Sequence, residues 1–377
     1  MASKLKDKWQ ESRKTPLTRC FFVCEESLLV IYAAIRFNED ILLDRQGTTM
    51  KLYKWVIAGV LAVVVASAFY TIKNGMEEKA EPKSHPAAVS SHKKPKEEAK
   101  KKMTLPNMGI QGKSVLLLNA KDGSILYEKN IHESLPPASI SKMMTELLVL
   151  RAVKKGEIQW DQSITISDYA YAISSHPGFA SIHLEKGKPY TVRELYEGMA
   201  IRSANEAAIA LAETVSGSEK DFVADMNKTA HQLGLTETHF VDSTGLSNLD
   251  LGEYYTTGGP NDTNVMSAND IGLLAMELLK EFPEVIDVMK QSSVTFGDHK
   301  YTNTNWMLPQ INKHDLGYAG VDGLKTGFTD EAGYCFAGTV KKDGVRLISV
   351  VLGAPSKTAR YTETKRLYDA AYNLISR

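Results

Sequence analysis

The sequence has no excess of charge of either sign, and this balance excludes one broad class of partner. Its 377 residues contain 45 Lys and Arg and 45 Asp and Glu, so the formal net charge is zero. A protein that binds nucleic acid normally carries a basic face or stripe, so we expect no nucleic-acid partner. The length is sufficient for one large domain with appended segments.

Cysteine is also scarce. The chain has three cysteines, Cys20 and Cys24 near its beginning and Cys335 far downstream. Because they are odd in number and scattered, they build no disulfide framework, and none has the paired spacing of a zinc site. We expect neither a metal nor another cofactor. Cys335 is most simply a small buried hydrophobic residue, with a reactive thiol as the alternative.

Two common hydrolase signatures are missing as well. There is no Gly-x-Ser-x-Gly elbow, which would present the serine of a Ser-His-Asp hydrolase. There is also no His-Glu-x-x-His stretch, which would indicate a zinc peptidase. A hydrolytic site in this chain must therefore be built in another way.

One long apolar run is present at residues 55–72, and it carries no charged residue. It is long enough to cross a bilayer as a helix, and the basic residues before it predict that residues 1–54 stay in the cytoplasm. The run also resembles a secretory signal that starts at Met50 and is cleaved after Ala68, in which case residues 1–49 are an extra segment. We favour a retained single-pass anchor in the cell membrane, with everything after it extracytoplasmic.

Residues 73–107 have the composition of a linker. They are rich in lysine and proline and have almost no bulky apolar side chains. Such a segment cannot bury enough surface to offset the entropy of ordering it. We predict a solvated spacer, with contacts to anionic wall polymers as the alternative, and a folded domain over residues 108–377.

The pattern within this domain predicts strands at both ends and helices between them. Residues 115–119 and 125–129 flank Asp122-Gly123, a hairpin signal. A helix is expected over residues 139–154, and a last one over 359–375. This arrangement favours one sheet built from both chain ends. Further helix starts are expected at Thr191, Ser218 and Ser267, and further strands at 324–329, 334–340 and 345–353.

Ser-x-x-Lys occurs four times, but only one copy lies in the expected domain. Three copies begin at Ser3, Ser90 and Ser91, before the apolar run or within the linker. The fourth pairs Ser139 with Lys142 in the first turn of a predicted helix, where residues three apart share a face. The free N–H groups and positive dipole of a helix start also suit an oxyanion. Ser139 is therefore the candidate nucleophile.

Two further short motifs are weaker by themselves. Ser-x-Asn occurs at 203–205 and at 267–269; the second opens a helix and fits a cap. The first lies between the predicted helices 192–201 and 206–215, and its catalytic and loop interpretations both stay open. Lys325-Thr326-Gly327 lies on a predicted strand, where glycine lets a ligand approach the backbone.

The order of the three motifs is what carries a resemblance. Ser-x-x-Lys, then Ser-x-Asn, then Lys-Thr-Gly is typical of penicillin-binding proteins and serine β-lactamases. Residues 110–377 resemble the low-molecular-mass D-alanyl-D-alanine carboxypeptidases of peptidase family S11. This resemblance implies a β-lactamase/transpeptidase-like α/β (α+β) fold, in which an antiparallel sheet built from both chain ends is flanked by helices and joined by a helical subdomain. The segments that carry it are 137–145, 203–208, 322–329 and 332–334, with the stretch that ends at Arg360.

The resemblance also implies a reaction. Ser139 would attack a peptidoglycan stem pentapeptide and form an acyl-enzyme as the terminal D-alanine leaves. Lys142 would take the serine proton, for which burial and a positive Lys325 must lower its pKa. Ser203 would relay a proton to the leaving group, with Lys325 nearby. β-Lactams, which imitate the end of the stem peptide, would acylate the same serine.

The remaining implied roles concern substrate binding. Asn205 would orient the substrate amide, and Thr326 and Arg360 would hold the free carboxylate. Gly327 would let the substrate approach the strand. Backbone N–H groups of Ser139 and Phe328 would form the oxyanion hole.

The chain departs from the family in two places, and two alternatives stay open. Many relatives carry a polar residue at the position of Phe328, and many continue beyond the last helix into a β-rich domain and an anchor, which residues 55–72 would replace here. One alternative is a non-catalytic or very slow wall-binding scaffold that kept the fold. The other is a β-lactamase, although the Glu-x-x-Leu-Asn segment of class A enzymes is absent.

Overall fold

The computed structural model describes residues 104–376. The predicted segments 1–54 and 55–72 lie outside this range, as does most of the predicted linker. Of the described helices, none combines the length and the apolar character that crossing a bilayer requires. The Leu105 N–H donates to the Leu126 carbonyl at 2.7 Å, so the chain contacts the folded domain from residue 105 onward.

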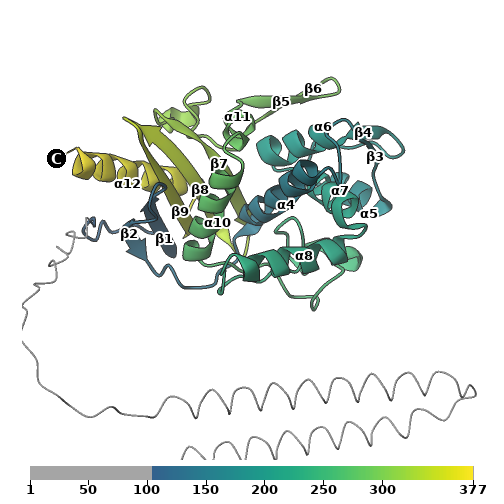
Figure 1. Ribbon diagram of the computed structural model, residues 1–377, viewed down its shortest axis with the longest axis horizontal. Helices are drawn as coiled ribbons and strands as arrows, with labels where there is room; N and C mark the ends of the chain where they lie inside the picture. Colours follow the sequence, from purple (N-terminus) through teal and green to yellow (C-terminus); the bar gives the residue numbers. More distant parts are fainter. Residues whose placement is uncertain (1–103, 377) are drawn as a thin grey trace, which may run out of the picture. The chain divides into compact units, whose positions relative to one another are not determined.

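The core of the domain is a five-stranded sheet in the order β2-β1-β9-β8-β7, with every neighbouring pair antiparallel. Because β1 pairs with β9, the beginning and the end of the domain meet inside one sheet, as Figure 1 shows. The predicted antiparallel sheet from both chain ends is therefore confirmed. Its strands are β1 (Ser114–Asn119), β2 (Ile125–Lys129), β7 (Val321–Thr329), β8 (Gly333–Lys342) and β9 (Val345–Ala354).

Both faces of this sheet are covered, and strand β1 shows how. Successive side chains of a strand point to opposite faces. Leu116 and Leu118 belong to the core shared with the central helices, whereas Val115 and Leu117 belong to the core closed by α12 (Ala359–Ile375). Because β1 is apolar on both faces, it has no polar alternation, and the sheet becomes the middle layer of the domain.

The helices other than α12 lie between the two halves of the sheet in the sequence, and most gather in a separate helical region in Figure 1. Helix α10 packs directly on β1 and β9, and α4 packs against α7 and α10. The helices are α4 (Lys142–Lys155), α5 (Asp168–Ser174), α6 (Val192–Glu197), α7 (Asn205–Ser216), α8 (Glu219–Gln232), α9 (Asn248–Leu251), α10 (Ala268–Glu281) and α11 (Val285–Met289). Two small two-stranded antiparallel sheets complete the domain: β3 (Ser163–Thr165) with β4 (Pro189–Thr191), and the hairpin of β5 (Ser293–Phe296) with β6 (His299–Thr302).

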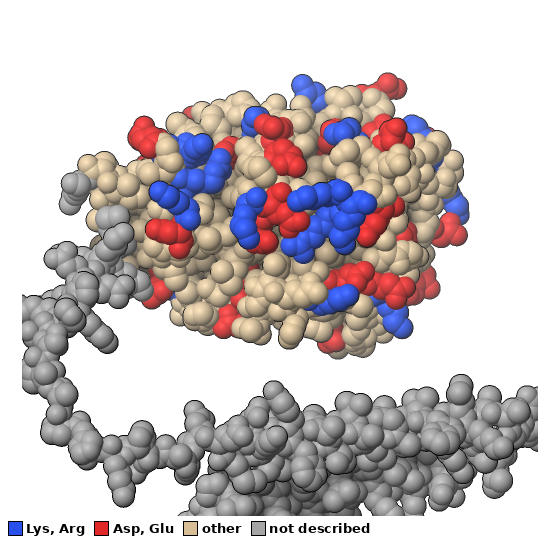
Figure 2. Space-filling model, viewed as in Figure 1, with Lys and Arg blue, Asp and Glu red and all other residues tan. Residues whose placement is uncertain are grey.

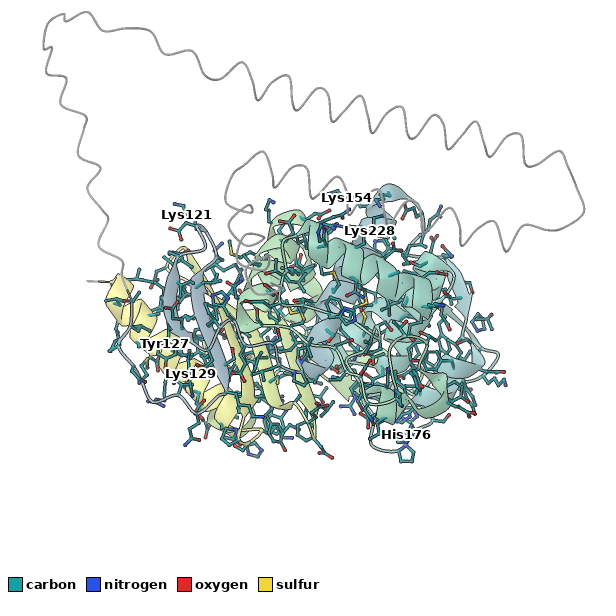
Figure 3. The ribbon with its side chains drawn as sticks, turned by 90° about the horizontal axis from the view of Figure 1, so that it is seen from below. Lys121, Tyr127, Lys129, Lys154, His176 and Lys228 are labelled. Atoms are coloured by element: carbon teal, nitrogen blue, oxygen red, sulfur yellow. The ribbon has the colours of Figure 1, made fainter. Side chains whose placement is uncertain are left out.

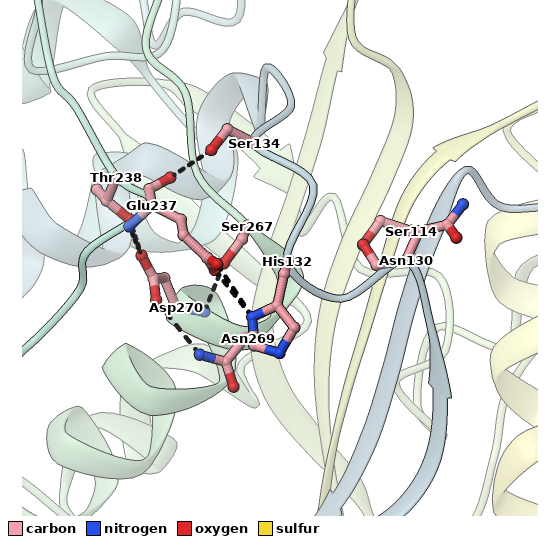
Figure 4. Close-up of polar contacts among 9 residues, drawn as sticks. All are labelled: Ser114, Asn130, His132, Ser134, Glu237, Thr238, Ser267, Asn269 and Asp270. Atoms are coloured by element: carbon pink, nitrogen blue, oxygen red, sulfur yellow. Dashed lines mark hydrogen bonds and ion pairs between the residues drawn. The ribbon is translucent and has the colours of Figure 1, made fainter. Parts of the chain in front are cut away.

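The start of α10 confirms that the second Ser-x-Asn copy is a helix cap. The Ser267 hydroxyl accepts the Asp270 N–H at 3.0 Å, and the Asp270 carboxylate accepts from the Glu237 N–H and the Thr238 hydroxyl, both at 2.8 Å (Figure 4). An N-cap of this kind satisfies a backbone donor that the helix cannot. The predicted caps Thr191 and Ser218 are also present.

Candidate active site

The candidate nucleophile lies just before a helix, not within its first turn. Residues Ala138–Ser141 form a 3₁₀ turn, η2, and α4 begins at Lys142, so the single helix predicted over 139–154 is wrong at its start. The Lys142 Nζ nevertheless lies 2.9 Å from the Ser139 Oγ. Ser139 is partly exposed, whereas Lys142 is 1% exposed. The serine hydroxyl is therefore accessible from solvent, and the lysine amine lies behind it in the interior.

Two oxygen atoms hold the Lys142 amine in place. Its Nζ donates to the Asn205 Oδ1 and to the Thr244 carbonyl, both at 2.6 Å. The Asp242 carboxylate shapes the loop that carries this carbonyl, because it accepts the N–H groups of Thr244 and Gly245 at 2.5 and 2.7 Å. This loop was not predicted from the sequence, although Asp-Ser-Thr-Gly is a turn pattern of the type in which Asp accepts a hydrogen bond from the backbone two residues on.

Glycine permits the close contacts around Ser139. Gly245 has φ +83°, and a Cβ there would collide with the Ala138 carbonyl. A Cβ on Gly327 of β7 would collide with the Pro137 carbonyl and lie 3.2 Å from the Ala138 Cβ. Only glycine lets the loop and the strand approach η2 from two sides, so both fix the position of Ser139.

Burial lowers the pKa of Lys142 to about 7, and the negative charges of Asp242 and Glu206 oppose this effect. Desolvation disfavours the charged form of a lysine. At neutral pH a large fraction of the amine is therefore uncharged and able to accept a proton. Part of our expectation is corrected: Lys325 is not among the groups that shift Lys142, whereas the charge of Lys142 helps burial to lower the pKa of Lys325.

The second lysine–serine contact comes from another pair of elements. Helix α6 ends in a turn of π-helix, η3 (Gly198–Arg202), and Ser203 follows in the left-handed region with φ +68°. This conformation is unfavourable for a residue other than glycine and is often found at functional sites. Lys325 lies on the edge strand β7, and its Nζ donates to the Ser203 Oγ at 2.6 Å. Burial lowers the pKa of Lys325 well below its usual value.

The predicted residues divide between the wall of one cavity and the layer behind it. The cavity has a volume of about 520 Å³. Lys142, Asn205 and Lys325 are at most 2% exposed and lie in the buried layer. The other six predicted residues line the cavity: Ser139, Ser203, Thr326, Gly327, Phe328 and Arg360.

Arg360 is less available for a carboxylate than the sequence suggests. It is 3% exposed and is therefore not a surface charge of α12. One terminal nitrogen donates to the carbonyls of Gly327 and Cys335 at 2.8 and 3.1 Å, and the other donates to the Tyr361 hydroxyl at 2.9 Å. The guanidinium thus connects β7, β8 and α12 before any ligand binds. Cys335 is fully buried, as its simplest interpretation predicted.

The other predicted binding residues also have partners within the protein. The Asn205 Oδ1 accepts from Lys142, so Asn205 orients that amine. The Thr326 hydroxyl donates to the Thr304 hydroxyl at 2.8 Å. Phe328 is 48% exposed, and its ring centroid lies 4.4 Å from that of Tyr334. No cluster within residues 104–376 has three or more His, Cys, Asp or Glu side chains placed to hold a metal ion.

Several site residues were not identified from the sequence. Burial raises the pKa of Glu146 to about 7 and raises that of Glu206, and the two carboxyls lie behind the cavity. Glu206 directly follows the Ser-x-Asn motif, and this position is the only signal the sequence offers for it. The cavity wall also contains Trp306 and three basic residues that no motif indicates, Arg202, Lys313 and Lys357.

Comparison with solved structures places this arrangement in the class of penicillin-binding proteins. The chain matches PBP3 of Streptococcus pneumoniae with 39% identity and a TM-score of 0.66, covering 69% of this chain and 73% of that one. It matches the ampicillin-bound form of penicillin-binding protein D2 of Listeria monocytogenes with 33% identity and a TM-score of 0.60, covering 71% of this chain and 100% of that one. The expected transpeptidase-like fold is therefore confirmed.

The sequence comparisons identify the family within this class. The model of the D-alanyl-D-alanine carboxypeptidase family, peptidase S11, matches residues 99–356, and the chain belongs to this family. The chain is 37% identical over 265 residues to the D-alanyl-D-alanine carboxypeptidase DacF of Bacillus subtilis, covering 70% of this chain. It is 33% identical over 266 residues to DacC of Escherichia coli, again covering 70% of this chain. The chain matches about three fifths of the length of these relatives, 62% in both cases.

Proposed function

We propose that the chain is a serine-type D-alanyl-D-alanine carboxypeptidase that removes the terminal D-alanine from peptidoglycan stem pentapeptides. The observation that carries this proposal is the 2.9 Å contact between the Ser139 Oγ and the Lys142 Nζ. A hydroxyl becomes a nucleophile when an adjacent base can take its proton. A lysine with a pKa of about 7 is such a base at neutral pH.

In the first step, the Ser139 oxygen attacks the carbonyl carbon of the penultimate D-alanine while its proton moves to Lys142. The C–N bond to the terminal D-alanine then breaks. Its amine takes a proton from the Ser203 hydroxyl, which Lys325 replenishes through their 2.6 Å contact. Water then attacks the ester on Ser139, and Lys142 returns its proton to the serine oxygen as the shortened peptide leaves. Of the two protons of the attacking water, one restores Lys325 and the other passes to solvent as the product becomes a carboxylate, so both lysines regain their starting states. N–H groups of Ser139 and Phe328 stabilise the oxyanion in both steps.

The substrate lies between β7 and the Ser203 turn. The Asn205 Nδ2 donates to a substrate carbonyl, since its Oδ1 is already engaged by Lys142. The Thr326 hydroxyl and the remaining guanidinium hydrogens of Arg360 bind the terminal carboxylate, and Gly327 leaves room for the peptide along β7. β-Lactams, which carry a comparable carboxylate beside a reactive carbonyl, acylate Ser139 and inhibit the enzyme.

Two readouts on one protein test this function. The full chain is incubated with fluorescent penicillin and, separately, with a stem pentapeptide. We expect covalent labelling and release of D-alanine, and the loss of both in Ser139→Ala. Labelling without release would instead support a wall-binding scaffold, and rapid loss of the label would support a β-lactamase.

We also propose that residues 55–72 anchor the enzyme to the cell membrane with its catalytic domain outside. The support is the uncharged run in the sequence with basic residues before it. Sequencing the amino terminus of the protein isolated from membranes tests the anchor. A chain that retains residues 55–72 is expected, whereas a chain that begins at Phe69 would show cleavage and secretion.

A further inference from the structure

The cavity that contains Ser139 has a one-sided charge. Four basic side chains line it, and no Asp or Glu does. The face of the domain seen in Figure 2 differs, because basic and acidic side chains lie next to one another there. The cavity is therefore suited to an anion. Its basic residues are Arg202, Lys313, Lys357 and Arg360.

Two of these cations lie against one aromatic ring of the cavity wall. The ammonium groups of Lys313 and Lys357 lie 4.7 and 4.4 Å from the centroid of the Trp306 ring. Both distances are within the roughly 6 Å range of a cation–π contact. Lys313 begins the short turn η5 (Lys313–Asp315), whereas Lys357 lies between β9 and α12, and both side chains are exposed. The ring thus gathers two charges from separate parts of the chain at a place that a ligand can reach.

A run of contacts joins this ring to the two residues that are proposed to bind the terminal carboxylate. Trp306 stacks on Tyr361 with a centroid separation of 6.0 Å, and the Tyr361 hydroxyl accepts from Arg360 at 2.9 Å. The same hydroxyl donates to the Thr304 carbonyl at 2.9 Å, and the Thr304 hydroxyl accepts from Thr326 at 2.8 Å. The two lysines therefore lie at the carboxylate end of the cavity.

Thr326 and Arg360 alone leave a carboxylate with unused acceptor positions. The Thr326 hydroxyl donates within the protein, and the Arg360 guanidinium already makes three hydrogen bonds there. A guanidinium has five N–H groups, whereas the two oxygens of a carboxylate offer about four lone pairs. A carboxylate at this end of the cavity can therefore accept from further donors.

The positive charges of the cavity lack partners within the domain. Its four cations form no ion pair with any residue of the described part of the chain. Partial burial lowers the pKa of Lys357, and the charges of Arg360, Lys313 and Arg202 lower it further. The cations thus repel one another, and a carboxylate bound among them would relieve this repulsion.

We propose that Lys313 and Lys357 bind the terminal carboxylate of the substrate together with Thr326 and Arg360, and so determine the preference for a free over an amidated peptide end. In the proposed binding mode, this carboxylate is the anionic group of the peptide that lies at their end of the cavity. The carboxylate of a β-lactam is held in the same way. This inference rests on the proposed function and adds two specificity-determining residues to it.

A pair of peptides that differ only at the terminal carboxylate tests this role. The first is Nα,Nε-diacetyl-L-Lys-D-Ala-D-Ala, and the second is its terminal amide, which has no negative charge. With the full chain we expect kcat/KM to be higher for the acid than for the amide. Added salt should reduce this ratio, since the two ammonium groups are exposed to solvent.

Matched double variants connect the ratio to the two lysines. Lys313→Gln with Lys357→Gln should lower kcat/KM for the acid about fivefold, as for favourable exposed ion pairs, and leave the value for the amide unchanged. Lys313→Arg with Lys357→Arg keeps both charges and should keep the ratio. The second control is Lys121→Gln with Lys228→Gln, which removes two exposed charges from the β1–β2 turn and from α8 and should also keep the ratio (Figure 3).

The outcomes separate this inference from the proposed function. The inference alone is overturned if the acid-to-amide ratio is the same in the Gln variant of Lys313 and Lys357 as in the unaltered chain, or if the Arg variant loses the ratio equally. If the unaltered chain cleaves neither peptide, the proposed function fails. The ratio is then taken from the concentrations of acid and amide that halve the rate of penicillin labelling, and these also serve if only the acid is cleaved.

Discussion

Lys142 shows how a residue that is normally charged becomes a base in this domain. Its amine is almost fully buried, and it donates hydrogen bonds to neutral oxygens of Asn205 and Thr244. Burial lowers its pKa to about 7 against the opposing charges of Asp242 and Glu206. The protonation state of the site at neutral pH is therefore the balance of a large desolvation effect and two nearby carboxylates.

The first prediction concerns pH. Below a pH of about 7, Lys142 is protonated and cannot accept the proton of Ser139, whereas above it the amine is neutral. We expect the second-order rate constant of labelling by fluorescent penicillin to rise with pH through a midpoint near 7. A rate that does not change with pH, or that rises only near the pKa of an ordinary lysine, would contradict the assignment.

The second prediction concerns Asp242. Replacing Asp242 by Asn removes a negative charge that raises the pKa of Lys142 and keeps an Oδ1 that can accept from Thr244 and Gly245. The midpoint of the labelling rate should therefore move to lower pH. Asp122→Asn, in the exposed turn after β1, is the control and should leave the midpoint unchanged. A midpoint that stays in place or moves upward in Asp242→Asn would show that Asp242 does not act on Lys142.

Short elements and loops place the reactive groups. The turn η2 and the π-helical turn before Ser203 each bring a serine to the cavity, and the loop at 242–246 brings a carbonyl to the Lys142 amine behind it. The long helices and the sheet supply the rigid surroundings. The positive φ angles of Ala138 and Ser203 show that two of these short connections are held in unfavourable conformations.

The third prediction compares two glycines with nearly the same backbone conformation. Gly245 and Gly217 have φ +83° and +81°, but only at Gly245 would a Cβ meet other atoms within 4 Å. Gly217→Ala should lower the free energy of unfolding by about 1 kcal/mol through its backbone conformation alone. Gly245→Ala should lower the free energy of unfolding by more than this. It should also slow penicillin labelling at least tenfold, since it displaces η2 and Ser139.

Chemical unfolding and labelling rates measure the two effects separately. Equal losses of stability and equal labelling rates in the two glycine variants would show that the contact between Gly245 and Ala138 does not position the nucleophile.

Elements with local signals could be predicted from the sequence. Helix α12 has the expected bounds, and the β1–β2 hairpin has its turn at Asp122-Gly123 as predicted. The β3–β4 pair and the β5–β6 hairpin were not predicted, because strands of three or four residues show no periodicity. The start of α4 was misplaced because Ala138–Ser141 forms a 3₁₀ turn under contacts from β7 and from Gly245, far away in the sequence.

At the scale of the whole domain, helix α12 packs on one face of the sheet and supports the site from there. This helix covers the core that contains Val115, Leu117 and Val351, and its first turn carries Arg360, which bonds to carbonyls of β7 and β8. The beginning and end of the folded domain therefore depend on one another, and the end holds the strand that carries Lys325 through Arg360.

The fourth prediction tests this dependence. Leu367 of α12 is fully buried, so Leu367→Ala should lower the free energy of unfolding by about 2–5 kcal/mol, as large-to-small changes in a core do. Lys365→Ala on the same helix should change it by less than about 0.5 kcal/mol. Denaturant unfolding measures both. A loss of similar size in the two variants would show that α12 is not part of the core.

The motifs predicted the site's reactive side chains but not its full environment. Ser139, Lys142, Ser203 and Lys325 could be found because each motif is a run of residue types in a fixed order. The Thr244 carbonyl could not be found in this way, because every residue has a carbonyl. Its orientation depends on a loop 102 residues away from Lys142. Lys313 and Lys357 were missed for a similar reason, because only the fold brings both to the ring of Trp306.

The central claim is that Ser139 forms a covalent acyl-enzyme, and mass spectrometry of the penicillin-treated full chain tests it most directly. Trypsin releases residues 130–142, a peptide with serines at Ser134, Ser139 and Ser141. Fragmentation of this peptide should place the penicillin adduct on Ser139 alone, and the adduct should be absent when Ser139 is replaced by Ala. An adduct on another residue, or none on the folded protein, would contradict the account.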